Sequence, residues 1–159
     1  MKEIIPPVDR ALLEKELTED LFVRKSNNGN TLIYIFTHDQ APNLMLEVGR
    51  LREISFRGAS GGTGKSTDID AFDTATIPFK QLIVWDPAEK EIVGGYRFII
   101  GNKVEKDDNG YPKTPTAKIF QFSKQFVDEY WPVTFELGRS FVQPLYQPTV
   151  NLRKGMYLS

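Results

Sequence analysis

The stretch QLIVWDPAEKEIVGGYRFII, residues 81–100, decides the fold of this chain. It contains two runs rich in β-branched and aromatic residues, separated by the turn-forming sequence DPAEK at 86–90. Two such runs joined by a short connection that contains proline are typical of antiparallel strands. The stretch therefore predicts a β-hairpin, in which the paired Gly94 and Gly95 indicate a bulge or the close approach of a neighbouring backbone.

Further strands and helices are predicted on both sides of the hairpin. Strands are indicated by β-branched and aromatic runs, and helices by apolar residues at helical spacing after a capping side chain. The expected elements are a helix at 10–20 capped by Asp9, a strand at 31–37, a helix at 43–56, a helix at 124–130 capped by Ser123 and a strand at 135–142. This order predicts one domain, residues 1–159, of mixed α/β (α+β) class with a largely antiparallel sheet.

Composition argues against several classes of function. The 159 residues carry 20 basic and 21 acidic side chains, a balance that argues against nucleic-acid binding driven by charge. Without cysteine the chain has no disulfide, thiolate nucleophile or cysteine-ligated metal. The single histidine, His38, argues against a His-based triad and against a His-rich metal site. No apolar run is long enough for a transmembrane segment, so we expect no metal, no nucleic acid and no membrane span.

The glycine-rich sequence GASGGTGKSTDIDAFD, residues 58–73, supports two interpretations. Gly64-Lys65-Ser66 match the end of a P-loop, which would make the chain a nucleotide-binding protein. However, alanine stands at the first required glycine, and the preceding residues have a helical rather than a strand period. The other interpretation is a mobile flap at 58–67 that closes over a site, with the chemistry carried by the carboxylates that follow it.

Charged residues interrupt two of the predicted strands. Arg97 lies within one apolar run, and Glu136 and Arg139 lie within another. Such charges either face water or are paired, because an unpaired buried charge is costly. Gly138 permits a bulge that would bring Glu136 and Arg139 to one face of the sheet. The sequence thus offers a network of alternating charge made of Arg52, Asp70, Asp73, Arg97, Glu136 and Arg139.

Four motifs in this order resemble a known family. They are Leu51-Arg52-x-x-x-Phe56, then Asp70-x-x-Asp73, then Val93-Gly94-Gly95-Tyr96-Arg97, and then Glu136-Leu137-Gly138-Arg139 with Ser140, Val142 and Pro144 after it. Over residues 45–146 the chain resembles the acyl-homoserine-lactone synthase branch of the GNAT-like acyltransferases. Within that branch it is most similar to the N-acyltransferases of ornithine- and glycine-lipid synthesis, often labelled "hemolysin-like".

The resemblance implies a fold and an activity. The fold would be a three-layer sandwich whose central sheet splays open to admit a pantetheine arm, and this chain would lack its C-terminal part. The activity would be transfer of a fatty acyl group from an acyl-thioester, on acyl carrier protein or coenzyme A, to the amine of an amino acid. No cofactor would be tightly bound. The protein would be cytoplasmic or peripheral at the inner face of the membrane, with acyl carrier protein and a second copy as partners.

The resemblance also implies roles for residues. Glu136 would be the catalytic base, since an amine must lose a proton to attack a thioester. Asp70 and Asp73 would bind the ammonium or orient the arginines, and Arg97 or Arg139 would pair with the acceptor carboxylate. The remaining expected substrate-binding residues are Arg52, Arg97 and Phe56, and the expected donor-binding residues are Phe141, Val142, Gln143, Arg153 and Lys154. Backbone N–H groups of residues 141–143 would stabilise the oxyanion of the reaction. A non-catalytic binding domain of the same fold remains as an alternative to the enzyme.

Overall fold

The computed structural model describes residues 1–27 and 29–147. Two α-helices and five strands carry the fold: α1 (Arg10–Glu16), β1 (Phe22–Lys25), β2 (Leu32–Phe36), α2 (Pro42–Gly58), β3 (Lys80–Asp86), β4 (Glu91–Ile100) and β5 (Phe135–Val142). Short 3₁₀-helices occupy Glu19–Leu21, Gly101–Lys103, Thr116–Lys118, Trp131–Val133 and Pro144–Tyr146, and a π-helix occupies Phe126–Tyr130. No helix among the described residues has the length and hydropathy needed to cross a bilayer.

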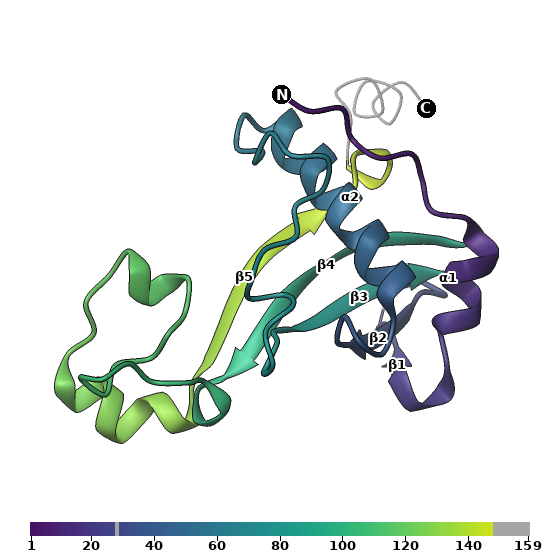
Figure 1. Ribbon diagram of the computed structural model, residues 1–159. Helices are drawn as coiled ribbons and strands as arrows, with labels where there is room; N and C mark the ends of the chain where they lie inside the picture. The colour runs from purple at the N-terminus through teal and green to yellow at the C-terminus, as the bar shows by residue number, and fades with distance from the viewer. Residues whose placement is uncertain (28, 148–159) are drawn as a thin grey trace, which may run out of the picture.

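The five strands form one antiparallel sheet in the order β1-β2-β3-β4-β5. Helix α2 and the connection from α2 to β3 run across one face of this sheet (Figure 1). The core lies between α2 and the sheet and includes Phe36, Val48, Ile83 and Trp85. The predicted mixed α/β class with an antiparallel sheet is therefore confirmed. Each neighbouring pair of described strands is hydrogen-bonded, so no splayed pair lies among them.

The predicted hairpin is formed by β3 and β4, and its glycines lie where neighbouring backbones approach closely. A Cβ atom at Gly95 would lie 2.3 Å from the Leu82 carbonyl oxygen, and one at Gly94 would lie 2.5 Å from the Phe141 carbonyl oxygen. Real Cβ atoms do not approach a backbone oxygen so closely. Any side chain at these positions would therefore push β4 away from β3 or β5.

Strand β5 carries the expected bulge. Gly95 pairs with Phe141 and Arg97 pairs with Gly138, which leaves one extra residue in β5 between the two pairs. The backbone at Arg139 has a φ of 54°, a conformation that non-glycine residues rarely adopt. The bulge brings Arg139 to the α2 face of the sheet, where Glu136 also lies, although a regular strand would separate two residues three apart.

The helix predicted at 10–20 is shorter than expected, and one strand was not predicted. Helix α1 begins after the Asp9 cap and ends at Glu16, and the chain then forms β1. All four side chains of β1 are exposed, so the segment has no period-two pattern to recognise. The predicted cap of the last helix is present, because Ser123 Oγ accepts a hydrogen bond from the Phe126 amide at 3.2 Å. The segment between β4 and β5 projects away from the sheet as a lobe (Figure 1).

Candidate active site

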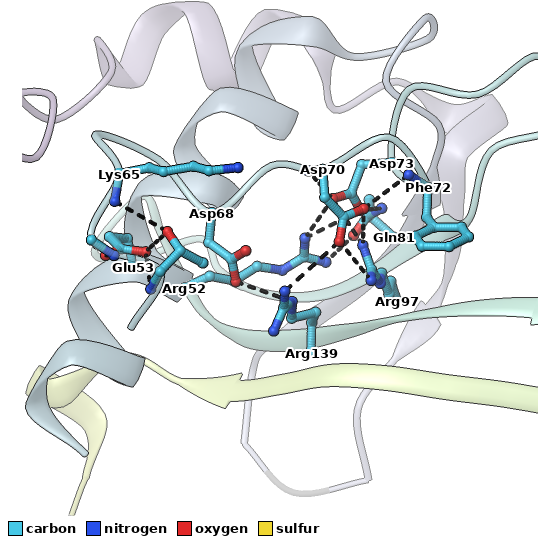
Figure 2. Close-up of polar contacts among 12 residues, drawn as sticks. Arg52, Glu53, Lys65, Asp68, Asp70, Phe72, Asp73, Gln81, Arg97 and Arg139 are labelled. Atoms are coloured by element: carbon cyan, nitrogen blue, oxygen red, sulfur yellow. Dashed lines mark hydrogen bonds and ion pairs between the residues drawn. The ribbon is translucent and has the colours of Figure 1, made fainter. Parts of the chain in front are cut away.

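Five of the six charged side chains expected to form a network meet on the α2 face of the sheet, namely Arg52, Asp70, Asp73, Arg97 and Arg139 (Figure 2). Arg52 comes from α2, Asp73 from the α2–β3 connection and Gln81 from β3. Arg52 donates to Asp73 Oδ1 at 3.2 Å and to Gln81 Oε1, while the Gln81 amide donates to Asp73 Oδ1 at 3.0 Å. All three residues are fully buried. Burial lowers the pKa of Arg52, and the Asp73 carboxylate opposes that effect.

Arg97 of β4 forms the second part of the network. It makes a bidentate contact with Asp70 at 2.8 and 2.9 Å, and it lies 3.0 Å from Asp73 Oδ2. Its guanidinium carbon lies 5.8 Å from the ring centroid of Phe72 and 5.1 Å from that of Phe79. Burial alone would lower the pKa of Arg97, but the hydrogen bonds from Arg97 to Asp70 and the charge of Asp73 together raise it. Two carboxylates and two aromatic rings thus hold the Arg97 guanidinium, although its Nε has no hydrogen-bond partner.

Arg139 is the accessible cation of the network. Its side chain is 35% exposed, whereas that of Arg97 is 3% exposed. Its Nε lies 3.2 Å from Asp68 Oδ2 without hydrogen-bond geometry, and its Nη2 lies 3.7 Å from Asp70 Oδ2. The guanidinium also lies 6.0 Å from the ring of Phe56. Burial raises the pKa of Asp68, and the charge of Arg139 opposes this effect. The Arg139 Nε is buried, but the Nη groups donate no hydrogen bond to the described residues, so they remain as donors for a further anion.

Glu136 lies on the same face but is not joined to the network by any hydrogen bond or ion pair of the described residues. It pairs with Ile99, two residues along the β4–β5 ladder from the pair of Arg97 and Gly138, a step of about 7 Å. Its Oε1 accepts a hydrogen bond from the Thr116 amide at 3.1 Å. Its Oε2 is buried and accepts no hydrogen bond. One oxygen of this carboxylate is therefore without a partner.

The residues expected to bind the donor occupy the end of β5. Phe141 belongs to the core, and the Gln143 amide donates to a β4 carbonyl at 3.0 Å, so that N–H is not available to an oxyanion. Strand alternation turns the Val142 N–H toward the outer edge of β5, which is the last strand of the described sheet. Of the three backbone N–H groups expected to bind the oxyanion, only that of Val142 faces outward. Two further expected donor-binding residues, Arg153 and Lys154, lie outside the described residues.

The glycine-rich loop after α2 is organised around the buried carboxylate of Glu53. Glu53 Oε2 accepts from the amide and the hydroxyl of Thr63 at 3.0 and 2.6 Å, and Oε1 accepts from the Gly64 amide at 2.8 Å and from Arg57 at 2.7 Å. Burial alone would raise the pKa of Glu53, but these hydrogen bonds together lower it to about 2. A protein carboxylate thus occupies the place where a P-loop would hold phosphate (Figure 2).

This geometry corrects both interpretations of the loop. The amides of Gly64-Lys65-Ser66 cannot surround phosphate because Glu53 and Thr63 already accept from the Gly64 and Lys65 amides, and a second anion there would be repelled. The loop is also not a free flap at 58–67. The Lys2 amide donates to the Gly64 carbonyl at 2.8 Å, and the Ile5 amide donates to the Ser66 carbonyl at 3.2 Å. The N-terminal segment and α2 therefore hold the loop from two sides.

Comparison with known proteins identifies the family of this chain. A family model described as the acetyltransferase (GNAT) domain matches residues 51–154, which carry all of the charged network. The chain belongs to the GNAT acetyltransferase family. Two relatives, from Bacteroides thetaiotaomicron and Phocaeicola vulgatus, are named glycine N(alpha)-acyltransferase and are 54% and 49% identical to it over 157 residues. These matches cover 99% of the chain but 47% and 48% of the relatives, so this GNAT chain spans about half their length. No solved structure matches it.

Three residues of this GNAT site were missed by sequence reasoning. They are the buried polar residues Asp68, Gln81 and Glu53. Asp68 pairs with Arg139, Gln81 accepts from Arg52, and Glu53 binds the glycine-rich loop. The available signal was polarity inside apolar segments, because Gln81 begins an apolar strand and Glu53 lies within the apolar stripe of α2. No cluster of three or more histidine or acidic side chains among the described residues is arranged to hold a metal ion.

Proposed function

We propose that this GNAT chain contributes the acceptor side of an N-acyltransferase, which moves a fatty acyl group from an acyl-thioester to the amine of glycine or another amino acid. The names of the two relatives support this activity. The observation that carries it is the presence, on one face of the sheet, of both a partly exposed arginine, Arg139, and a carboxylate with one unpartnered oxygen, Glu136. An amino acid presents the complementary groups, a carboxylate and an amine that must lose a proton.

The reaction needs little besides a base and correct placement of two substrates. The neutral amine attacks the thioester carbonyl, a C–N bond forms, and the C–S bond breaks as the thiolate leaves. Glu136 accepts the proton that the ammonium loses before attack, directly or through a water molecule, and the second proton that the nitrogen loses after attack passes to the departing thiolate. No covalent intermediate on the protein is required, in keeping with a chain that has no cysteine.

The arginines have different roles in this proposal. Arg139 binds the acceptor carboxylate, because it is the most exposed arginine of the network and its Nη groups donate no hydrogen bond to the described residues. Asp70 receives the ammonium group, since it is the most exposed carboxylate of the network. Arg52 and Arg97 are too deeply buried to reach an acceptor in this conformation, so with Asp73 they hold Asp70 in place. The last expected acceptor contact, Phe56, packs beside the Arg139 guanidinium.

The proposal extends to the donor and to the cellular role. Acyl carrier protein or coenzyme A would deliver the acyl group as a co-substrate, with no tightly bound cofactor. The order of the four motifs supports the hemolysin-like group of ornithine- and glycine-lipid N-acyltransferases. A product with a fatty chain would place the protein in the cytoplasm or at the inner face of the membrane, and a second copy is a further expected partner.

An acylation assay tests the proposal. The purified protein is incubated with glycine and with either acyl carrier protein or coenzyme A carrying a fatty acyl chain, and N-acylglycine is measured by mass spectrometry. Glu136→Gln should keep the fold, because the amide oxygen still accepts from the Thr116 N–H. It should lower the rate by about 100-fold or more, the usual contribution of a general base. Glu89→Gln, at an exposed turn position, serves as the matched control.

Each result of this assay has a definite meaning. Normal turnover by Glu136→Gln would show that Glu136 is not the catalytic base. Binding of glycine without product, by wild-type protein and with both donors, would favour a non-catalytic domain of the same fold. Comparison of the two donors decides between carrier protein and coenzyme A, because the acyl chain and the acceptor are the same in both reactions.

A further inference from the structure

A cavity of about 770 Å³ lies between residues 71–79 of the α2–β3 connection and residues 104–118 of the β4–β5 connection. We call it the trough. Apolar side chains form much of its lining, including Phe72, Ile77, Phe79, Ile99, Val104 and Ala117. Charged lining residues such as Glu105 and Lys113 are exposed and therefore lie at the rim. A volume of this size is within the range of about 300–1,000 Å³ that is usual for small-molecule sites.

The trough lies next to the charged network on one side and next to the strand pair that contains Glu136 on the other. The Phe72 and Phe79 rings, which line it, also flank the Arg97 guanidinium of the charged network. On the other side, Ile99 lines the trough and is the cross-strand partner of Glu136. Figure 2 shows Phe72 beside Arg97 and Asp70, at the end of the network. A ligand in the trough would therefore lie beside Ile99, one strand away from Glu136.

The chemistry of the trough fits one of the two substrates. Glycine has no apolar side chain to bury, so it gains nothing from an apolar cavity. An alkyl chain does gain, because each methylene removed from water contributes about 0.8 kcal/mol. The Lys118 ammonium lies 4.7 Å from the Phe72 ring centroid, which lays the methylene stem of this lysine along the trough wall.

A second cavity of the described residues has a different character. Its volume is about 420 Å³, and it lies at the opposite end of β4, beside Gln143. Its lining includes Arg10 and Glu91, which pair with each other, and Arg50 and Glu47, which also pair. Burying an alkyl chain among these ion pairs would remove water from charged groups at a cost. This cavity is therefore a poor site for an alkyl chain.

We propose that the trough binds the alkyl chain of the acyl donor, with the thioester end directed toward Glu136 and the charged network. The inference rests on the proposed N-acyltransferase function and adds to it the site and the class of the donor's acyl group, a chain long enough to fill an apolar cavity. It predicts that the lining of the trough sets the chain-length preference of the reaction.

A binding experiment tests the trough without requiring catalysis. A dansyl-labelled undecanoate is bound to the intact protein, and it is displaced with octanoate, decanoate and dodecanoate below their micelle concentrations. Each added methylene that enters the trough should tighten binding by up to about fourfold. An affinity that does not change from octanoate to dodecanoate would overturn the proposal.

Two variants that fill the trough from opposite walls locate the site. Ala75 and Ala117 line the trough, so Ala75→Trp and Ala117→Trp should each abolish the chain-length dependence. Ala88→Trp, at an exposed position of the β3–β4 turn, is the matched control and should bind like the wild-type protein. Thermal unfolding shows that each variant is folded. Wild-type binding by both trough variants, when folded, would overturn the proposal.

The failure of this inference can be told apart from the failure of the proposed function. In the acylation assay, the trough variants should lose activity with long-chain donors and keep it with acetyl donors. Acylation with an unchanged chain-length preference in both variants would overturn the trough and leave N-acylation standing. Chain-length-dependent binding that the variants remove, in a protein with no acylation of any amino acid, would leave the trough standing and overturn the N-acyltransferase.

Discussion

At the scale of the residue, Asp73 is the centre of the site. Its carboxylate contacts two arginines, Arg52 and Arg97, accepts from the Gln81 amide and also accepts from the Asp70 N–H at 3.0 Å. Two buried cations beside one another would repel strongly without this anion between them. The D-x-x-D motif is thus one turn in which Asp73 holds the arginines and fixes Asp70.

We expect Asp73→Asn to destabilise the protein by about 3–5 kcal/mol, because it leaves the buried Arg52 guanidinium without its carboxylate partner, whereas Arg97 keeps Asp70. The free energy of unfolding, measured by urea denaturation, checks this value. Asp128→Asn is the control, since Asp128 forms an exposed i,i+4 pair with Lys124. Loss of such a surface pair should change stability by at most about 1 kcal/mol. Equal effects of the two substitutions would contradict the central role of Asp73.

The charged network shows what sequence reasoning can recover at this scale. The pairing of Arg97 with Asp70 and Asp73 follows from a simple constraint, because a charge inside an apolar strand must find a partner. The partners themselves come from distant segments, so the resemblance to known motifs was needed to select them. Asp68 was missed because it lies in a polar loop segment, where nothing in the sequence indicates that the carboxylate is buried.

At the scale of the element, the β-hairpin and α2 were predicted well because each has a strong pattern over many residues. Strand β1 was missed since its side chains are all exposed and show no alternation. The P-loop interpretation of the glycine-rich loop was wrong for a different reason. Glycines allow several backbone N–H groups to point at one anion, but the sequence does not say whether that anion is a phosphate or a protein carboxylate. In this fold the occupant is Glu53, one helical turn before the loop.

The anchoring of this loop by Glu53 predicts a pH dependence of stability. The pKa of Glu53 is lowered from 4.5 to about 2 in the folded protein, so its stabilising effect is fully present above 4.5. The effect is lost as the pH falls from about 4.5 to 2, because the unfolded chain then binds a proton that the folded chain does not. We therefore expect the wild-type protein to lose stability over this range.

Glu53→Gln should lack this part of the acid transition, because an amide does not titrate. The midpoint of urea unfolding, measured between pH 6 and pH 3 in steps, checks the difference between the two proteins. Glu89→Gln, at an exposed position, should follow the wild-type curve. An identical pH slope for wild-type protein and Glu53→Gln would show that Glu53 does not anchor the loop.

At the scale of the whole molecule, the two faces of the sheet differ. One face is covered by α2 and the α2–β3 connection (Figure 1). The other face is apolar, and strand alternation places exposed side chains of β5 on it, namely Phe135, Leu137 and Val142 at 56%, 61% and 45% exposure. Large apolar patches on a protein surface usually mark contact with another polypeptide, and β5 is also an open strand edge among the described residues.

This apolar face should bind the dye anilinonaphthalene sulfonate in the folded state, which compact proteins with covered cores bind weakly. Phe135→Lys combined with Leu137→Lys should lower the dye signal by about half or more while changing stability little, since both side chains are exposed. Leu12→Lys, an exposed apolar position on α1, is the control and should leave the signal unchanged.

Sedimentation velocity on the same proteins tests the expected second copy, because the lysines should dissociate a dimer formed through β5. Dye binding that survives the double substitution but disappears in Ala75→Trp would assign the dye to the trough and contradict the prediction for this face.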